Sequence, residues 1–255
     1  MERKIAGYGW SRDLPDGRDF MYGAPPAVLG KLPESVDLRP GCPPVYDQGQ
    51  LGSCTANAIG GALEFDQLKQ QKPKASTPSR LFIYYNERAI EHTIDSDSGA
   101  QIRDGVKSVH KLGAPPEDPD WPYDITKFSQ KPPDKAYKDA MNYQALVYQR
   151  VTPTLGQLKG CLASGYPFIF GFTVYESFES QEMASSGHLG MPQSGEKQLG
   201  GHAVLAVGYQ DSSQTFIVRN SWGADWGIKG YFTMPYPYLL QGTLASDFWT
   251  IRTVE

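Results

Sequence analysis

The chain has 255 residues, of which 40% are hydrophobic and 20% are charged, and its formal net charge is −4. A chain of this length can bury one large core or the cores of two small lobes. Its charge is slightly acidic and contains no run of Lys or Arg, so neither a nucleic acid nor a membrane surface is expected as a partner. No apolar run approaches the roughly 18 residues that a membrane-spanning helix needs.

The N-terminal residues 1–7 are followed by polar residues rather than by an apolar stretch. This pattern argues against a secretory signal peptide. We therefore expect a cytoplasmic location by default, with export left open.

Residues 1–38 are rich in Gly, Pro, Asp and Arg and show neither a helical nor a strand period. Aromatic residues are scattered through them, including Tyr8, Trp10 and Phe20. We expect an extended arm that lies on the body of the protein through these aromatic side chains. The alternative is a disordered tail.

The helical signal lies between residue 54 and about residue 145. The segments 115–119 and 121–123 carry the prolines and turn residues of loops. We expect helices that begin at Cys54, run from Ser79 to Arg88, and run from near Gly99 to Leu112.

Short apolar runs of strand length take over after about residue 146. A short helix is expected near residues 155–163, and the polar segment 176–198 predicts a long loop. Helices followed by strands, without regular alternation, predict an α+β fold. The expected strands are 146–148, 168–174, 203–209, 215–219, 230–234 and 248–252.

Cys54 is the most informative residue, because Gln48 stands six positions before it across a glycine-rich turn. A cysteine at a helix N-terminus feels the positive end of the helix dipole, which favours the nucleophilic thiolate. Such a nucleophile needs a base and a group that orients the base. His202 opens a predicted strand after two glycines, and Asn220 ends the next strand before a Ser-Trp-Gly turn.

These residues, in this order, resemble the papain family of cysteine peptidases. The resemblance includes the Ser-Val-Asp-Leu-Arg run at 35–39, similar to the start of a mature family member, and Trp121-Pro122-Tyr123. It covers roughly residues 35–255. It implies a papain-like two-lobed α+β fold with a helical left lobe, an antiparallel β-barrel-like right lobe, and the active site in the cleft between them. The implied parts are a short arm or pro-segment (1–38), a helical lobe with Cys54 (39–145) and a β-rich lobe with His202 and Asn220 (146–255).

The resemblance implies a cysteine endopeptidase that hydrolyses peptide bonds through a Cys54 thioester. His202 would take the thiol proton and later protonate the leaving amine, while Asn220 would hold the imidazole in position. Gln48 and the Cys54 N–H would form the oxyanion hole. Trp222 would shield the bond between Asn220 and His202 from water. No cofactor is implied, and the remaining Cys and His residues lack the spacing of metal ligands.

Substrate contacts follow from the same resemblance. Ser98 and Gly99 match a strip whose backbone pairs with an extended peptide, although Gly99 can also be read as a simple helix-start residue. Gly201 would offer its carbonyl to the substrate. Gly171 and Gly200 match positions beside the main specificity pocket and would leave it roomy enough for bulky apolar or aromatic side chains. The expected partner is a peptide or unfolded protein, and a monomer is expected.

Three features depart from the family pattern. Thr55 stands where an aromatic residue usually follows the nucleophile, so the packing of that helix must differ. Leu51 stands where a disulfide-forming cysteine is common, which fits a reducing compartment or a bacterial or archaeal branch. The segment before Ser35 is too short for the helical inhibitory propeptide of cathepsins. We expect it instead to cross the body and partly cover the cleft, restraining activity.

The remaining cysteines and histidines show no second site. Cys42 and Cys161 could pair, but Cys161 lies in an apolar helical pattern and is more simply a small buried residue. His92, His110 and His188 have no partner pattern and are expected at the surface.

Two other functions stay open. One is a catalytically silenced papain-fold protein that binds peptides, against which the four filled catalytic positions argue. The other is an acyltransferase, in which an amine other than water intercepts the same thioester. The sequence does not separate that reaction from hydrolysis.

Overall fold

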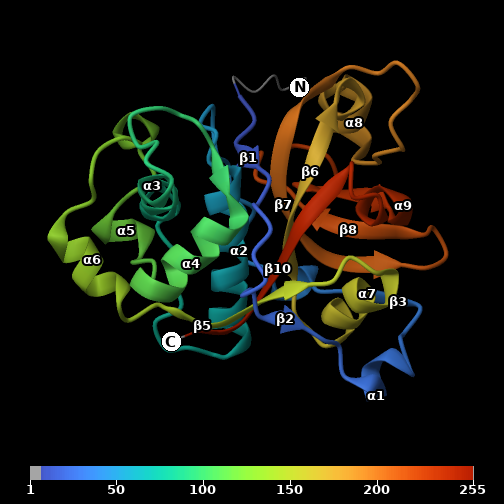
Figure 1. Cartoon of the computed structure of the whole chain (residues 1–255), viewed down its shortest axis with the longest axis horizontal. Helices are drawn as coiled ribbons and strands as arrows, with labels where there is room; N and C mark the ends of the chain where they lie inside the picture. Colours follow the sequence, from blue (N-terminus) through green and yellow to red (C-terminus); the bar gives the residue numbers. More distant parts are fainter. Residues whose placement is uncertain (1–6, 255) are drawn as a thin grey trace.

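The computed structural model describes residues 7–254 and places a helical part beside a strand-rich part (Figure 1). The helical part contains α2 (Cys54–Lys69), α3 (Arg80–Ile90), α4 (Ile102–Leu112), α5 (Glu117–Asp120) and α6 (Asp134–Ala140), with 3-10 turns at η1 (Arg39–Gly41) and η2 (Ile125–Lys127). The strand-rich part contains β5 (Ala145–Val151), β6 (Phe168–Tyr175), β7 (Gln198–Gln210), β8 (Thr215–Arg219), β9 (Tyr231–Pro235) and β10 (Ala245–Val254). Its helical segments are α7 (Leu155–Ala163), η3 (Glu176–Glu179), α8 (Gln181–Ser186) and α9 (Tyr236–Leu240). The expected α+β class is confirmed.

The main sheet has the strand order β2-β5-β10-β6-β7-β8-β9, and β3 (Ser35–Asp37) pairs with β7 beside this path. Neighbouring strands are antiparallel except β2 (Met21–Tyr22), which runs parallel to β5. The sheet is open because its path ends at β2 and β9, and residues 7–254 form no closed barrel.

Helix α2 is the central element of the helical part. Its residues 54–67 are all buried, because it packs against α3 and α4 on one side and against β7 and β10 on the other. Ala58, Ile59, Ala62 and Leu63 contribute to the apolar core between these layers. Because α2 lies at the boundary between the two parts, its first residue, Cys54, also lies there.

The N-termini of α3 and α4 can be compared with the helix starts expected from the sequence. Ser79 accepts the backbone N–H of Phe82 at 3.2 Å and begins α3, as expected from the sequence. Helix α4 begins at Ile102 rather than near Gly99. The reason is that the two residues before it form β4 (Ala100–Gln101), which pairs with the N-terminal arm.

The arm follows an extended path between the helical part and the sheet, where Figure 1 draws it in dark blue. Its strand β1 (Trp10–Ser11) pairs with β4 in parallel, β2 extends the main sheet, and α1 (Pro26–Leu29) contacts α7. For residues 7–38, the extended arm is therefore confirmed over the disordered tail.

The polar segment 176–198 was expected to be a loop, and that expectation is wrong for its first half. Residues 176–179 form η3 and residues 181–186 form α8. Ser180 caps α8 by accepting the N–H of Met183 at 3.0 Å, and Met183 is buried in the core of the sheet. In the expected loop 115–119, residues 117–120 form the short segment α5, but Asp118 within it has extended backbone angles (φ −115°, ψ 128°), so the segment is not a regular helix. Helices this short contain too few residues to show a period in the sequence.

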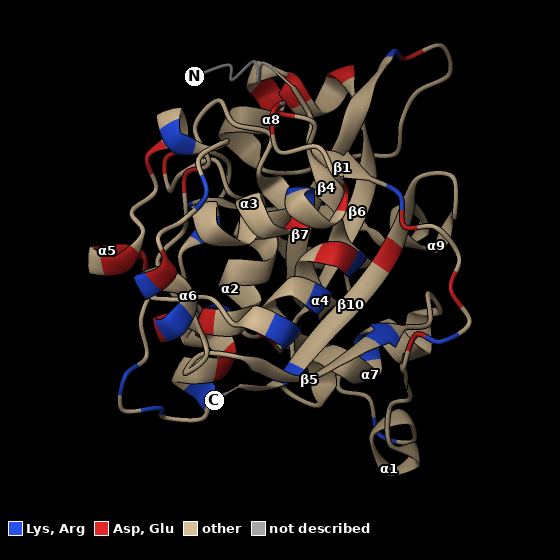
Figure 2. Cartoon of the chain, turned by 60° about the vertical axis from the view of Figure 1, so that its left-hand side comes forward, with Lys and Arg blue, Asp and Glu red and all other residues tan. Residues whose placement is uncertain are grey.

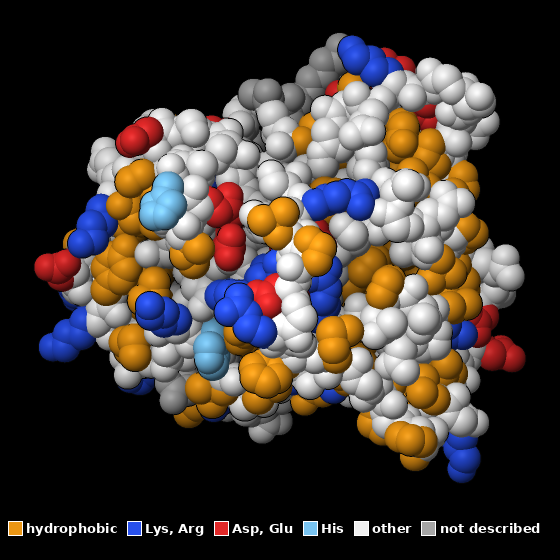
Figure 3. Space-filling view, viewed as in Figure 1, with side chains coloured by type: hydrophobic (Ala, Val, Ile, Leu, Met, Phe, Trp, Pro, Cys, Tyr) orange, Lys and Arg blue, Asp and Glu red, His pale blue; other side chains and the backbone are white. Residues whose placement is uncertain are grey.

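Charged positions of both signs are interspersed over the chain (Figure 2), and several gather at the centre of the face shown in Figure 3. No helix within residues 7–254 is long and apolar enough to cross a membrane. His92, His110 and His188 are exposed, as expected. Cys42 and Cys161 are free thiols, so the pairing considered from the sequence does not form.

Candidate active site

Cys54 is the first residue of α2 and is fully buried. Burial raises the pKa of its thiol to about 12, while backbone hydrogen bonds from Ala203 and Gly9 act in the opposite direction. Ala203 follows His202 in β7, and Gly9 belongs to the arm. The thiol therefore lies between the sheet and the arm. In this covered state, the loss of water around the sulfur outweighs the helix-dipole effect that favours a thiolate.

His202 and Asn220 are joined by a hydrogen bond of 2.8 Å between Nε2 and Oδ1. His202 lies in β7, and Asn220 follows the last residue of the neighbouring strand β8. Oδ1 also accepts the backbone N–H of Ser221 at 2.9 Å, which identifies it as the amide oxygen. Because an amide oxygen only accepts, Nε2 carries the proton in neutral His202, and Nδ1 carries the lone pair.

Aromatic side chains pack around His202 and Asn220. The Trp222 ring lies 5.2 Å from the His202 ring, and the rings of Phe172 and Phe178 lie 5.7 and 6.1 Å from it. Trp226 packs edge-on against Trp222 at 5.2 Å. All four are buried, so little water reaches the hydrogen bond between His202 and Asn220.

Gln48 is held between the loop that precedes Cys54 and the loop that carries Asn220. Its Oε1 accepts the hydroxyl of Ser221 at 2.6 Å, its backbone N–H donates to the Ser221 carbonyl at 2.9 Å, and its Nε2 donates to the carbonyl of Leu51 at 2.9 Å. A chain of contacts therefore connects all four predicted positions: Gln48 to Ser221, Asn220 to His202, and Ala203 to Cys54.

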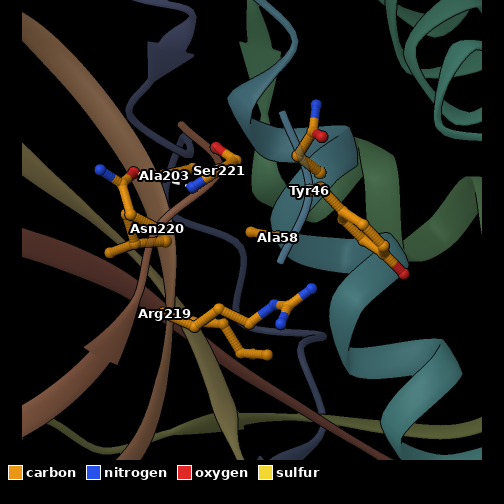
Figure 4. A pocket seen from close by; sticks show the side chains of 9 residues that line it. Tyr46, Ala58, Ala203, Arg219, Asn220 and Ser221 are labelled. Atoms are coloured by element: carbon orange, nitrogen blue, oxygen red, sulfur yellow. Dashed lines mark hydrogen bonds between the residues drawn. The ribbon is translucent and has the colours of Figure 1, made fainter. Parts of the chain in front are cut away.

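A cavity of about 10 Å³ lies where α2 meets the middle of β7 and the end of β8 (Figure 4). Ala58 of α2 lines it on one side, and Ala203 and Asn220 line it on the other. This volume suits no more than a single water molecule. The two parts of the protein thus meet closely behind the site.

The N-terminal arm covers the site. The Tyr8 ring meets the His202 ring edge-on at 6.1 Å, and the Tyr8 hydroxyl donates to Glu179 at 2.6 Å. The carbonyl of Gly9 accepts the backbone N–H of Ala100 at 2.8 Å, next to the thiol of Cys54. The side chain of Trp10 is also buried.

Four of the five residues predicted to bind substrate lie against this arm. A Cβ at Gly99 would overlap the backbone of Gly9, and one at Gly171 would overlap the Trp10 ring. A Cβ at Gly201 would lie 2.6 Å from Trp10, and one at Gly200 would lie 2.7 Å from Cβ of Tyr8. Ser98, the fifth, donates its hydroxyl to the carbonyl of Gly99 at 3.1 Å. The arm thus fits the surface that these glycines leave free of side chains.

Two further side chains were missed by sequence reasoning. Asp247 lies in β10 and accepts the indole N–H of Trp10 at 3.2 Å. Glu87 of α3 is fully buried and accepts the hydroxyl of Thr55, the residue after Cys54, at 2.6 Å. Thr55, noted as an unusual residue, was the only signal in the sequence for the second contact.

Comparison with known proteins gives matches over most of the chain. The model of the papain family of cysteine proteases matches residues 32–238. An uncharacterized peptidase C1-like protein of Acanthamoeba polyphaga mimivirus is 50% identical over 271 residues, which cover 97% of this chain and 87% of that protein. Thiol protease aleurain of Arabidopsis thaliana is 32% identical, over 84% of this chain and 59% of its own length.

The fold agrees as well. Xylellain, a cysteine protease from Xylella fastidiosa, superposes with a TM-score of 0.91 and 46% identity, over 100% of this chain and 99% of that one. Digestive procathepsin L 3 of Tenebrio molitor shares the fold with a TM-score of 0.68 at 19% identity, over 95% of this chain and 74% of that one. The chain therefore has the papain-like fold and belongs to the papain family of cysteine proteases.

Proposed function

We propose that this cysteine protease is an endopeptidase that acts through a Cys54 thioester, with His202, Asn220 and Gln48 as its catalytic partners. The observation that carries the proposal is the bond between Nε2 of His202 and Oδ1 of Asn220. This bond fixes the tautomer, so the lone pair of Nδ1 is the one that can accept the thiol proton. The contact of Ala203 with the Cys54 thiol supports this direction of transfer.

The proposed reaction has two halves. Proton transfer from Sγ of Cys54 to Nδ1 of His202 gives a thiolate, which attacks the substrate carbonyl carbon. The Cys54 N–H and the Gln48 amide stabilise the resulting oxyanion, a contribution of roughly 10²–10³ in rate for one such donor. His202 then protonates the leaving amine as the C–N bond breaks. In the second half, His202 takes a proton from water, the hydroxide attacks the thioester, and the thiol and a carboxylic acid are released.

We propose that the arm, within residues 1–38, restrains this activity by occupying the substrate strip. Its contacts support the proposal: Tyr8 meets His202, Gly9 bonds to Ala100, and Trp10 packs on Gly171. A main-chain hydrogen bond of this kind is what an extended peptide would make on adding as a strand. Peptide and arm would therefore compete for one surface.

The first test is covalent labelling of the full chain by a thiol-reactive peptidyl epoxide. Labelling should stop in Cys54→Ala and persist in Cys161→Ala, which also removes a buried thiol. Hydrolysis of a fluorogenic peptide should follow the same pattern. Hydrolysis that survives Cys54→Ala would contradict the proposal.

The arm is tested by two glycine substitutions within it. A Cβ at Gly9 would overlap the carbonyl of Gly52, whereas one at Gly17 would meet no atom within 4 Å. Gly9→Ala should displace the arm and raise the rates of peptide hydrolysis and Cys54 labelling, while Gly17→Ala should leave both unchanged. Equal rates in the two variants would contradict the proposed restraint.

A further inference from the structure

The peptide group between Leu51 and Gly52 lies shortly before the proposed nucleophile and is hydrogen-bonded on both sides. Its carbonyl, on Leu51, accepts Nε2 of Gln48 at 2.9 Å. Its N–H, on Gly52, donates to the carboxylate of Asp97, whose two oxygens both lie 3.0 Å from the nitrogen. One planar, rigid group therefore connects a carboxylate to the amide that is proposed for the oxyanion hole.

The carboxylate end of this connection is fixed by α3. Asp97 lies in the loop between α3 and β4, and its Oδ1 accepts the hydroxyl of Tyr84 from α3. The same hydroxyl accepts the backbone N–H of Gly99 at 3.1 Å. Nη1 of the buried Arg88 donates to the carbonyl of Ser96, the residue before Asp97, at 2.8 Å. The carboxylate is therefore held in one direction, although Asp97 is itself an exposed residue.

The other end of the connection is the side-chain amide of Gln48. Its Oε1 accepts the hydroxyl of Ser221 at 2.6 Å, and one N–H of its Nε2 is bonded to Leu51. Because Nε2 carries two N–H bonds, the direction of the second is set by the carbonyl that holds the first. Leu51 cannot form the disulfide that is common at its position in the family, so the orientation of this carbonyl depends on hydrogen bonds.

We infer that Asp97 is a positioning residue of the oxyanion hole: it holds the peptide group between Leu51 and Gly52 so that the Gln48 amide faces the substrate oxygen. The inference rests on the proposed function and adds a residue to it. Without the carboxylate, the N–H of Gly52 loses its partner, the peptide group is free to rotate, and the amide bonded to its carbonyl moves with it. Because the oxyanion forms only after attack, the cost falls on kcat rather than on KM.

The kinetic test uses the full chain with Gly9→Ala, in which the arm should be displaced. Asp97→Ala should lower kcat for a fluorogenic peptide about tenfold, a part of the roughly 10²–10³ that one donor contributes, and should leave KM within about twofold. Asp97→Asn keeps an acceptor oxygen for the N–H of Gly52 and should recover most of the rate. Asp95→Ala, which removes another exposed acid from the same loop, is the matched control and should leave kcat unchanged.

A general loss of structure is distinguished by alkylation of Cys54 with iodoacetamide. This reaction replaces iodide at a saturated carbon and forms no oxyanion, so its rate should be the same with and without Asp97→Ala. An alkylation rate that falls by the same factor as kcat would overturn the inference. So would a kcat of the Asp97→Ala chain within twofold of its parent.

A double-mutant comparison shows whether Asp97 acts through Gln48. In a chain that already carries Gln48→Ala, adding Asp97→Ala should cause no further loss of kcat, because the amide that it positions is gone. Losses that multiply would overturn the inference. A Gln48→Ala chain whose kcat is unchanged would instead contradict the proposed oxyanion hole itself.

The connection between the two residues can also be followed without turnover. In NMR spectra of the full natural chain labelled with ¹⁵N, the side-chain amide signals of Gln48 should shift in Asp97→Ala and stay in place in Asp95→Ala. Gln48 signals that do not respond to Asp97→Ala would overturn the inference, whether or not the chain hydrolyses peptides.

Discussion

The hydroxyl of Thr55 donates to Oε1 of Glu87 across 2.6 Å, directly after the nucleophile position. Burial raises the pKa of Glu87 well above its usual range, although the bond from Thr55 acts in the opposite direction. A Cβ at Gly105 of α4 would lie 2.6 Å from Oε2, so that glycine makes room for the acid. The small Thr55 and the glycine together admit a polar contact at the place where the family usually has an aromatic residue.

This contact predicts unequal effects on stability. Thr55→Val keeps the shape of the side chain but removes the only donor to Oε1 among residues 7–254, and should lower the free energy of unfolding by about 1–3 kcal/mol. Glu87→Gln keeps an acceptor for the hydroxyl and should change stability far less. Urea denaturation of both variants decides the matter, and equal losses would show that the contact contributes nothing specific.

Asp66 predicts a pH dependence of stability. It is buried in α2, and neither carboxylate oxygen has a hydrogen-bond partner within residues 7–254. Burial raises its pKa to about 8, against the effects of Lys69 and Arg252. Because the folded state holds the proton more tightly than the unfolded chain, the stabilisation is complete below pH 4 and is lost as the pH rises through 8.

Asp66→Asn removes that titration. The variant should therefore gain stability relative to the natural chain between pH 5 and pH 8. Chemical denaturation at several pH values measures the difference, in which the titrations of other buried acids largely cancel. If the free energies of unfolding of the two chains changed in parallel with pH, Asp66 would not be the titrating group.

Asn220 predicts a loss of rate rather than of affinity. In the Gly9→Ala chain, Asn220→Ala would free the His202 ring to rotate and to change tautomer, so kcat should fall by more than about tenfold with KM little changed. Asn142→Ala, at an exposed position, is the matched control. A kcat that stays within twofold of the parent would remove Asn220 from the proposed machinery.

The proposed catalytic positions could be predicted because each has a local signature. Cys54 follows a glycine-rich turn and begins a helical pattern, while His202 and Asn220 stand at strand ends marked by Gly and Trp residues. The pocket glycines were predicted from the family resemblance. Gly171 and Gly200 predicted a roomy pocket, and in the structure the aromatic side chains of Trp10 and Tyr8 lie against them.

The acceptor in that pocket could not be predicted. Asp247 reaches it only because β10 gains one residue against β6, a register shift that depends on pairing with a strand far away in the sequence. The hydrogen bond between Thr55 and Glu87 joins two helices, and the hydrophobic periodicity of neither helix predicts it. The arm was expected to cross the body, but its register on β4 depends on glycine contacts that no pattern in residues 7–38 shows.

Asp13 predicts that the arm binds less tightly as the pH rises. Its carboxylate accepts Nε1 of Trp249 at 2.8 Å and the N–H of Arg103 at 3.0 Å, beside the carboxylate of Asp247. Burial and Asp247 raise the pKa of Asp13 to about 6, although Trp249 and Arg103 lower it. The bound arm therefore holds the proton more tightly than a released arm. This stabilisation is complete below about pH 4, the usual aspartate pKa, and is lost as the pH rises through 6.

The labelling rate of Cys54 measures this effect when the rate of the natural chain is divided by that of a variant. The titration of the thiol is common to both chains and cancels in this ratio. Asp13→Asn keeps polar atoms at the position but cannot ionise, so the labelling rate of the natural chain relative to Asp13→Asn should rise between pH 5 and pH 7. Asp16→Asn changes another acid of the arm, whose pKa is lowered by Arg18 rather than raised, and should leave that pH dependence as it is in the natural chain. A ratio that stays constant from pH 5 to pH 7 would show that Asp13 does not control the docking of the arm.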